Sequence, residues 1–265
     1  MLTDTHAHLN DKAFDADRAE VLKNARALGV ERIVEIACAP ADWAGGEAMA
    51  AANAGLRCAF GIHPEYVKDF DPASLPRLET FLAKPCAVAL GEIGLDYWWE
   101  AARREAQLEL LAAQLPLCAK FGRPAVFHAR NGKEQGQDAY AELLSVLKGW
   151  NYSPKARFRG VLHCFSGGWK DAAAALDMGL ALGVNGTFTY KKNDDLRLTV
   201  KKAGIANIVL ETDCPYLPPQ SARGQRNDPA FIPEIAAMVA GHLGLGNTQT
   251  ADATTANAFA LFGEF

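Results

Sequence analysis

Short apolar runs alternate along this chain with longer amphipathic stretches. The runs are rich in Val, Ile, Leu and Ala, a composition typical of parallel strands that are buried on both faces. Eight such runs predict strands at residues 1–9, 32–39, 56–64, 86–96, 123–130, 159–168, 180–187 and 207–215. Helical spacing of apolar residues predicts helices at 18–28, 42–53, 73–84, 101–120, 136–149, 169–178, 193–203, 231–243 and about 249–262.

Eight strands that alternate with helices predict parallel pairing through crossover connections, and eight is the number that closes a barrel. We therefore expect an α/β protein with a TIM-type (β/α)8 barrel, in a single domain that spans residues 1–265. An open doubly wound sheet is the rival architecture, because periodicity alone does not exclude it. Pro116 lies inside the fourth helical stretch and should kink it or break it in two.

Charge and composition narrow the classes of partner. A net charge of −4 lacks the basic footprint of a protein that coats nucleic acid. A phosphate-bearing substrate remains compatible if metal ions and local Arg and Lys residues supply the positive field. The six cysteines form no C-x-x-C pair and are interpreted as buried apolar side chains in a reducing compartment. The N-terminus has no signal-peptide pattern and no run matches a membrane span, so we expect a cytoplasmic protein.

Titratable side chains fall at the ends of the predicted strands. In a β/α barrel these ends meet at one mouth, where active sites are built. The spacing of His6 and His8 sends both imidazoles to the same side, since strand side chains alternate. Imidazole and carboxylate ligands together suit Zn²⁺ or Mn²⁺, and also Mg²⁺ when waters complete the shell. The predicted metal ligands are His6, His8, Glu92, His128, His163 and Asp213.

Six ligands are too many for one four-coordinate ion but suffice for two divalent ions if a carboxylate bridges them. We assign Glu92 as the bridge, and Asp213 as the general base that takes a proton from a metal-activated water. Two such ions can also clamp a phosphoryl group. The other ligands divide into His6, His8 and Asp213 for one ion, and His128 and His163 for the other.

Three further residues are candidates for contact with the substrate. His63 ends the third strand and is expected to bind phosphate, assist proton transfer or cap the following loop. Arg130 lies two residues past His128, and Arg223 lies in the long final loop. Both arginines could hold phosphates, with solvated surface charge as the alternative. Glu211 shares a face with Asp213, where it either supports the site or is a polar group of the barrel interior.

With these residues in view, the chain resembles the TatD family of metal-dependent deoxyribonucleases. The resemblance implies a β/α barrel, two metal ions held by the same six residues, and hydrolysis of DNA phosphodiester bonds. It also implies 3′–5′ exonuclease activity with some endonuclease activity, on single-stranded DNA or 3′ ends. The matching stretches, in family order, are "DTHAHLN", "GIHPE", "GEIGLDY", "FHAR", "HCFSG", "ETDCPYLPP", "RGQRNDP" and "TTANAFALF".

Three features depart from that family pattern, and one of them is Pro116 in the fourth helical stretch. Glu65 stands where family members often have a second histidine, and a carboxylate there would repel phosphate unless it turns outward or binds a cation. The paired Trp98 and Trp99 are also unusual. Their rings could stack on bases at a strand-binding rim, but packing against a neighbouring helix is the favoured interpretation.

Two other functions remain open. The same metals could direct a water at the carbonyl of a small amide, ester or lactone, because a fold does not fix its substrate. A non-catalytic protein stabilised by metal is the third possibility, although structural metal sites are usually closed and this one gathers carboxylates at an open mouth.

Overall fold

The computed structural model describes residues 1–154 and 156–265, and in it the eight predicted strands pair side by side in sequence order. Every neighbouring pair is parallel, and a bridge between Ala7 and Cys214 joins the first strand to the segment after the last. The sheet thus curls into a nearly closed barrel, which excludes the open doubly wound alternative. The strands are β1 (Leu2–Ala7), β2 (Val30–Ala37), β3 (Leu56–Phe60), β4 (Ala87–Asp96), β5 (Ala125–Arg130), β6 (Gly160–Leu162), β7 (Leu180–Val184) and β8 (Ile208–Leu210).

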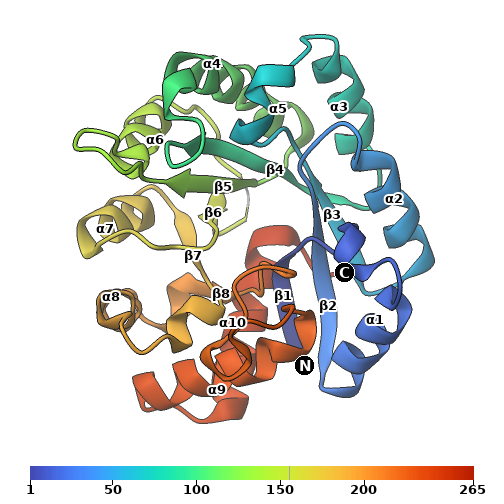
Figure 1. The fold of residues 1–265 in the computed structure, drawn as a ribbon, viewed down its shortest axis with the longest axis vertical. Helices are drawn as coiled ribbons and strands as arrows, with labels where there is room; N and C mark the ends of the chain where they lie inside the picture. The colour runs from blue at the N-terminus through green and yellow to red at the C-terminus, as the bar shows by residue number, and fades with distance from the viewer. Residues whose placement is uncertain (155) are drawn as a thin grey trace.

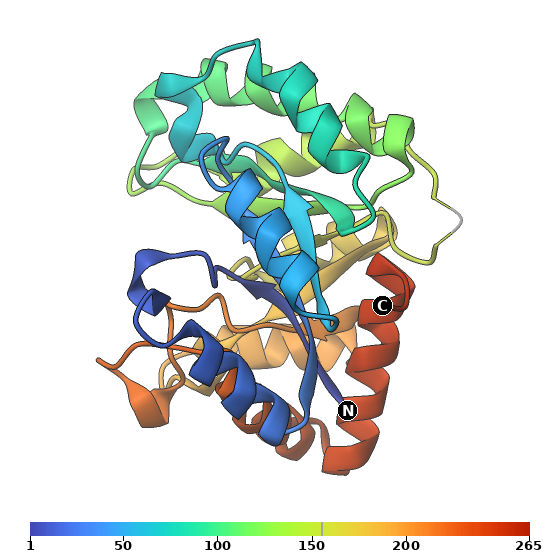
Figure 2. The same ribbon diagram turned by 90° about the vertical axis from the view of Figure 1, so that its right-hand side faces the viewer.

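Helices surround the strands in an outer ring (Figures 1 and 2). Short 3-10 turns occupy several of the connections. The helices are α1 (Arg18–Ala27), α2 (Trp43–Ala52), α3 (Ser74–Leu82), α4 (Arg104–Gln114), α5 (Pro116–Phe121), α6 (Ala139–Lys148), α7 (Trp169–Asp177), α8 (Asp194–Ala203), α9 (Ile232–Leu243) and α10 (Asn247–Phe262). All predicted helices are confirmed, and the predicted break falls where Pro116 begins α5, directly after α4.

The last helix, α10, closes one end of the barrel. Its Thr255 hydroxyl donates to the carbonyl of Met1, and its Asn257 amide donates to the carbonyl of Ile208, at the beginnings of β1 and β8. Its Leu261 joins the small apolar side chains that fill the barrel interior. Because α10 covers the end where the strands begin, the end where they finish is left free for a site.

The connection after β3 is held by a side chain of α4. Gln114 is fully buried, and its amide group both accepts from the N–H of Ile62 and donates to the carbonyl of Ile62, at 2.9 and 3.1 Å. This pair mimics backbone pairing at a point where β3 has already ended. It fixes the approach to His63, the next residue in the chain.

The fourth strand ends at residue 96, as predicted, but Glu92 does not lie at that end. Glu92 lies inside β4, four residues before Asp96. His128 likewise lies inside β5, two residues before its end. These side chains therefore reach the pocket from the walls of the barrel rather than from its rim.

No single helix among the described residues combines the length and apolar character needed to cross a membrane. One strongly bent pair, Pro229–Leu243 with Asn247–Phe262 at 109°, passes that test only when its two parts are taken together. That residues 1–265 form a single domain stays a prediction.

A substitution at Gly94 tests how tightly β4 and β5 are packed. Gly94 has a φ of +144°, and an added Cβ would lie 2.0 Å from the carbonyl oxygen of His128. Positive φ and overpacking each cost on the order of 1–3 kcal/mol, so Gly94→Ala should lower the free energy of unfolding by about 3 kcal/mol. Urea unfolding measures this. Gly241→Ala, in α9 with open space around it, should change stability by less than about 1 kcal/mol; equal losses in both variants would contradict the packing argument.

Candidate active site

The predicted site residues meet in a cavity of about 620 Å³ at the carboxyl end of the barrel. His6 lies just beneath it, fully buried. Arg223 is the exception, because it lines a neighbouring cavity of about 530 Å³ together with Tyr190, over whose ring its guanidinium lies at 4.4 Å. The predicted residues that line the main cavity are His8, His63, Glu92, His128, Arg130, His163 and Asp213.

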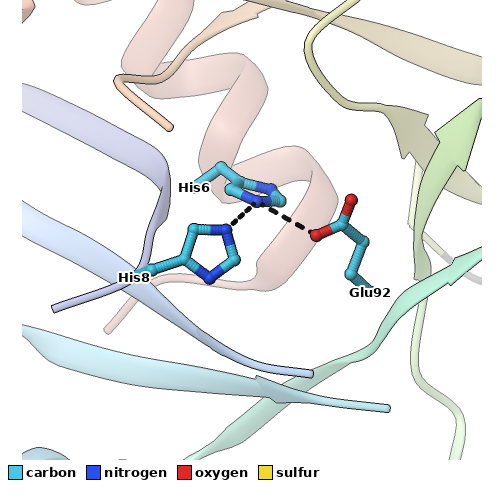
Figure 3. A group of neighbouring side chains, drawn as sticks. All are labelled: His6, His8 and Glu92. Atoms are coloured by element: carbon cyan, nitrogen blue, oxygen red, sulfur yellow. Dashed lines mark hydrogen bonds and ion pairs between the residues drawn. The ribbon is translucent and has the colours of Figure 1, made fainter. Parts of the chain in front are cut away.

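Glu92 is the centre of this arrangement. Its Oε2 lies 3.5 Å from Nε2 of His6, on the side shown in Figure 3. Its Oε1 lies 2.7 Å from Nδ1 of His128 and 2.5 Å from Nε2 of His163. The two oxygens of one carboxylate therefore face two different groups of imidazoles.

Asp213 completes the group around the first pair of histidines. Nε2 of His6 and Nε2 of His8 are 3.2 Å apart, and Oδ1 of Asp213 lies 3.6 and 3.4 Å from them. Asp213 adopts a φ of +61°, and its N–H donates to the carbonyl of His6. The backbone of β1 thus fixes the position of a carboxylate that arrives from β8, more than 200 residues later.

Buried carboxyl groups support these segments from below. Asp4 accepts hydrogen bonds from the N–H of His6 and from both the N–H and the hydroxyl of Thr212. Glu35 accepts from the N–H groups of Leu9 and Asn10, just after His8. Each carboxyl therefore ties a segment that carries predicted site residues to a neighbouring strand. These hydrogen bonds explain why an acidic residue such as Asp4 occupies a buried position.

Glu211 supports the opposite wall. It accepts a hydrogen bond from the N–H of Cys164, and its Oε1 lies 3.8 Å from Nδ1 of His163. The imidazoles of His6 and His163 stack with ring centroids 3.9 Å apart. A Cβ on Gly183 would lie 2.3 Å from Oε2 of Glu211, so a glycine is required there to make room for the carboxyl group.

The electrostatics favour an ionised carboxylate at the centre. Burial alone would raise the pKa of Glu92, but His163, His63 and His128 outweigh it and hold that pKa well below 4.5. Burial likewise opposes protonation of His128, yet the carboxylates of Asp96 and Glu92 raise its pKa to about 10. The pocket is therefore built to stabilise positive charge next to Glu92.

Asp96 was missed by the sequence analysis. Its Oδ2 lies 2.9 Å from Nε2 of His128, on the far side of the ring from Glu92. The available signal was its position as the last residue of the run "GEIGLD", where a strand end in a barrel points toward the site. A carboxylate behind an imidazole fixes the ring's orientation and tautomer, and here it turns Nδ1 toward Glu92.

His63 differs from the other histidines in its hydrogen bonding. Its Nδ1 accepts from the N–H of Glu65 at 3.1 Å, and its Nε2 lies 3.6 Å from Oε1 of Glu92. Burial lowers the pKa of His63 to about 3, so the ring is neutral at ordinary pH. A neutral ring whose Nδ1 accepts must carry its proton on Nε2, which makes His63 a hydrogen-bond donor toward the cavity.

The donor atoms suit divalent cations. His6, His8 and Glu92 each offer one ligand atom within 4.8 Å of the others, and so do His63, Glu92 and His128. Around Oε1 of Glu92, Nδ1 of His128 and Nε2 of His163 lie 3.1 Å apart, close enough to hold one cation in place of a proton. Nitrogen and carboxylate oxygen together form a donor set for Zn²⁺, Mn²⁺ or Mg²⁺.

Comparison with known proteins agrees with this geometry. The family described as "TatD related DNase" matches residues 3–263. A Bacillus subtilis protein named "Uncharacterized metal-dependent hydrolase YabD" is 31% identical over 99% of both chains. The "3′-5′ ssDNA/RNA exonuclease TatD" of Klebsiella pneumoniae is 32% identical over 98% of this chain and 97% of that protein. The crystal structure of YjjV, a TatD homologue from Escherichia coli K12, superposes with a TM-score of 0.91 at 29% identity, over 100% of this chain and 98% of that one.

Barrel, site and relatives together define a metal-dependent hydrolase of the β/α-barrel type. Within that class, the chain belongs to the family of TatD-related DNases. The resemblance drawn from the sequence motifs is therefore confirmed.

Removal of the Asp96 charge tests the electrostatics around His128. In the metal-free protein, Asp96→Asn should lower the pKa of His128 by at least about one unit, because the carboxylate stabilises the protonated ring whereas an amide does not. NMR titration of the imidazole measures this change. Glu79→Gln removes a carboxylate that pairs with Lys120 on the surface and should leave the His128 titration as it is. An unchanged pKa in Asp96→Asn would refute the assigned contact.

Proposed function

We propose that this chain hydrolyses phosphodiester bonds of DNA, with single strands or 3′ ends as substrate, by means of two divalent metal ions (Mg, Mn or Zn). The observation that carries the proposal is the position of Glu92, whose two oxygens face separate groups of imidazoles. A carboxylate in that position can bridge two ions. The residues that would hold the ions are His6, His8 and Asp213 on one side, His128 and His163 on the other, and Glu92 between them.

Ions bound there would polarise the phosphoryl group and lower the pKa of an attacking water. The side chains of this chain supply the rest of the chemistry. The three histidines nearby, with a hydrogen bond from His8, keep the pKa of Asp213 low in spite of its burial. An ionised carboxylate at the cavity wall can accept a proton, so Asp213 would act as the general base.

His63 and the arginines would act on the substrate. The proton on Nε2 of His63 points into the cavity beside Glu92, where it can donate to a phosphate oxygen. Arg130 lines the same cavity and would pair with the phosphate of the strand. Arg223 lies in the adjoining cavity and would hold a phosphate further along the backbone.

The substrate assignment draws on the relatives. The Klebsiella pneumoniae protein is named as an exonuclease of single-stranded DNA and RNA. Identity near 30% supports a shared reaction more strongly than a shared substrate, so polarity and strand preference belong to this proposal. A cytoplasmic location likewise stays a prediction.

Metal removal is the first test. The metal-free protein should be inactive, and addition of Mg²⁺, Mn²⁺ or Zn²⁺ should restore shortening of a single-stranded DNA oligonucleotide. Elemental analysis should find two ions per chain. Glu92→Gln should lose bound metal and at least about 1000-fold in activity, because the bridge serves both ions. Glu65→Gln changes a half-exposed carboxylate of the same cavity and should keep its metal.

Two results would replace the proposal. Turnover of acyl or amide substrates alone would identify a small-molecule amidohydrolase. Metal that raises the melting temperature without turnover of any substrate would identify a structural metal site.

A variant of His63 separates substrate contact from metal binding. His63→Ala should lower kcat by about 100-fold, the usual effect of losing one hydrogen-bond donor to a developing charge, while metal content stays at the wild-type level. Steady-state kinetics and elemental analysis on the same preparation measure both quantities. Loss of metal in His63→Ala would instead assign His63 as a ligand.

A further inference from the structure

Two adjacent tryptophans lie exposed at the rim of the catalytic cavity. Trp98 and Trp99 follow β4 after one intervening residue, Tyr97, and have exposed fractions of 37% and 60%. Trp99 also lines the cavity itself. The expected packing against a neighbouring helix does not bury Trp99, which is mostly exposed, and leaves more than a third of Trp98 exposed. Large aromatic side chains exposed beside a site are characteristic of binding surfaces.

Two cations lie over these rings. The guanidinium of Arg130 is 5.0 Å from the ring centroid of Trp98 and 5.6 Å from that of Trp99. The ammonium of Lys133 is 4.6 and 5.7 Å from the same centroids. Within residues 1–154 and 156–265, neither cation forms an ion pair with a carboxylate. Their charges therefore remain available to an anionic ligand that contacts the aromatic rings.

Asp96, a residue of the site, fixes the position of the two tryptophans. Oδ1 of Asp96 accepts from the N–H groups of Trp98 and Trp99 at 2.8 and 2.9 Å. Its other oxygen, Oδ2, contacts His128. One carboxylate thus holds both the tryptophan turn and an imidazole of the centre, so the rings stand at a set distance from the reacting phosphate.

We propose that Trp98, Trp99, Arg130 and Lys133 form a stacking platform for a nucleobase of the single-stranded substrate, with the two cations holding its flanking phosphates. This inference rests on the proposed function and adds a subsite to it. Every base has a π-face, so stacking on tryptophan tolerates any sequence. Bases in a duplex already stack on one another, so the platform favours single strands and frayed ends.

Binding to a strand that cannot be cleaved provides the direct test. The probe is an end-labelled, phosphorothioate-linked oligothymidylate of about ten nucleotides, and fluorescence anisotropy with the metal-loaded protein measures its affinity. Trp99→Ala should weaken binding by about 10-fold, and the double variant Trp98→Ala/Trp99→Ala by about 10- to 100-fold, since stacking of one base on an aromatic ring contributes such factors. Trp99→Phe, which keeps a ring, should recover most of the affinity.

A strand without bases separates stacking from a structural effect. On an abasic oligonucleotide of the same length, the wild-type protein and the double variant should bind the phosphorothioate-linked form equally. They should also be equal in kcat/KM on the cleavable, phosphodiester-linked form, because only the base contacts the rings. Trp169→Ala is the matched control: Trp169 is also exposed and pairs with a lysine, Lys202 at 5.5 Å, but it lines neither cavity. This variant should retain wild-type affinity for both strands.

Two outcomes would overturn the platform: equal affinity of the double variant and the wild-type protein for oligothymidylate, or an equal loss on the abasic strand. Failure of the proposed function would look different. In that case the metal-loaded wild-type protein cleaves no oligonucleotide. The difference in affinity for oligothymidylate between the wild-type protein and the double variant is still measurable.

Discussion

The structure depends on a single buried carboxylate surrounded by imidazoles. Glu92 reaches the pocket from the wall of β4, and histidines from four other segments approach its two oxygens. A buried carboxylate is stable only when positive charge or hydrogen-bond donors surround it. The site therefore requires that strands distant in sequence be held at fixed angles around one volume, and closure of the barrel provides this constraint.

Buried acids between neighbouring strands convert that closure into precise positions. Asp4 joins the backbone before His6 to the segment before Asp213, and Glu211 joins the β8 side to the wall that carries His163. Asp96 extends the same principle outward, because its two oxygens connect His128 with the tryptophan turn at the rim. The chemistry at the centre and the proposed contacts with substrate are thus linked through short, direct hydrogen bonds.

Charge on this protein is distributed to suit an anionic substrate although its net charge is negative. The cations near the mouth lie on aromatic rings, Arg130 and Lys133 on the tryptophans and Arg223 on Tyr190. A ring holds a cation in place without neutralising it, whereas a carboxylate partner would cancel its field. Local positive charge at the mouth is therefore compatible with a net charge of −4.

The sequence by itself determined the eight strands, the helices between them and the convergence of the histidines with Glu92 and Asp213. It could do so because hydrophobic periodicity is a local signal and because parallel strands of a barrel share one end. Tertiary structure alone decided that Glu92 projects from inside β4, that His63 is a donor with its proton on Nε2, and that Trp98 and Trp99 are exposed. These features depend on which atoms meet across the barrel, and such contacts between distant segments leave no period in the chain.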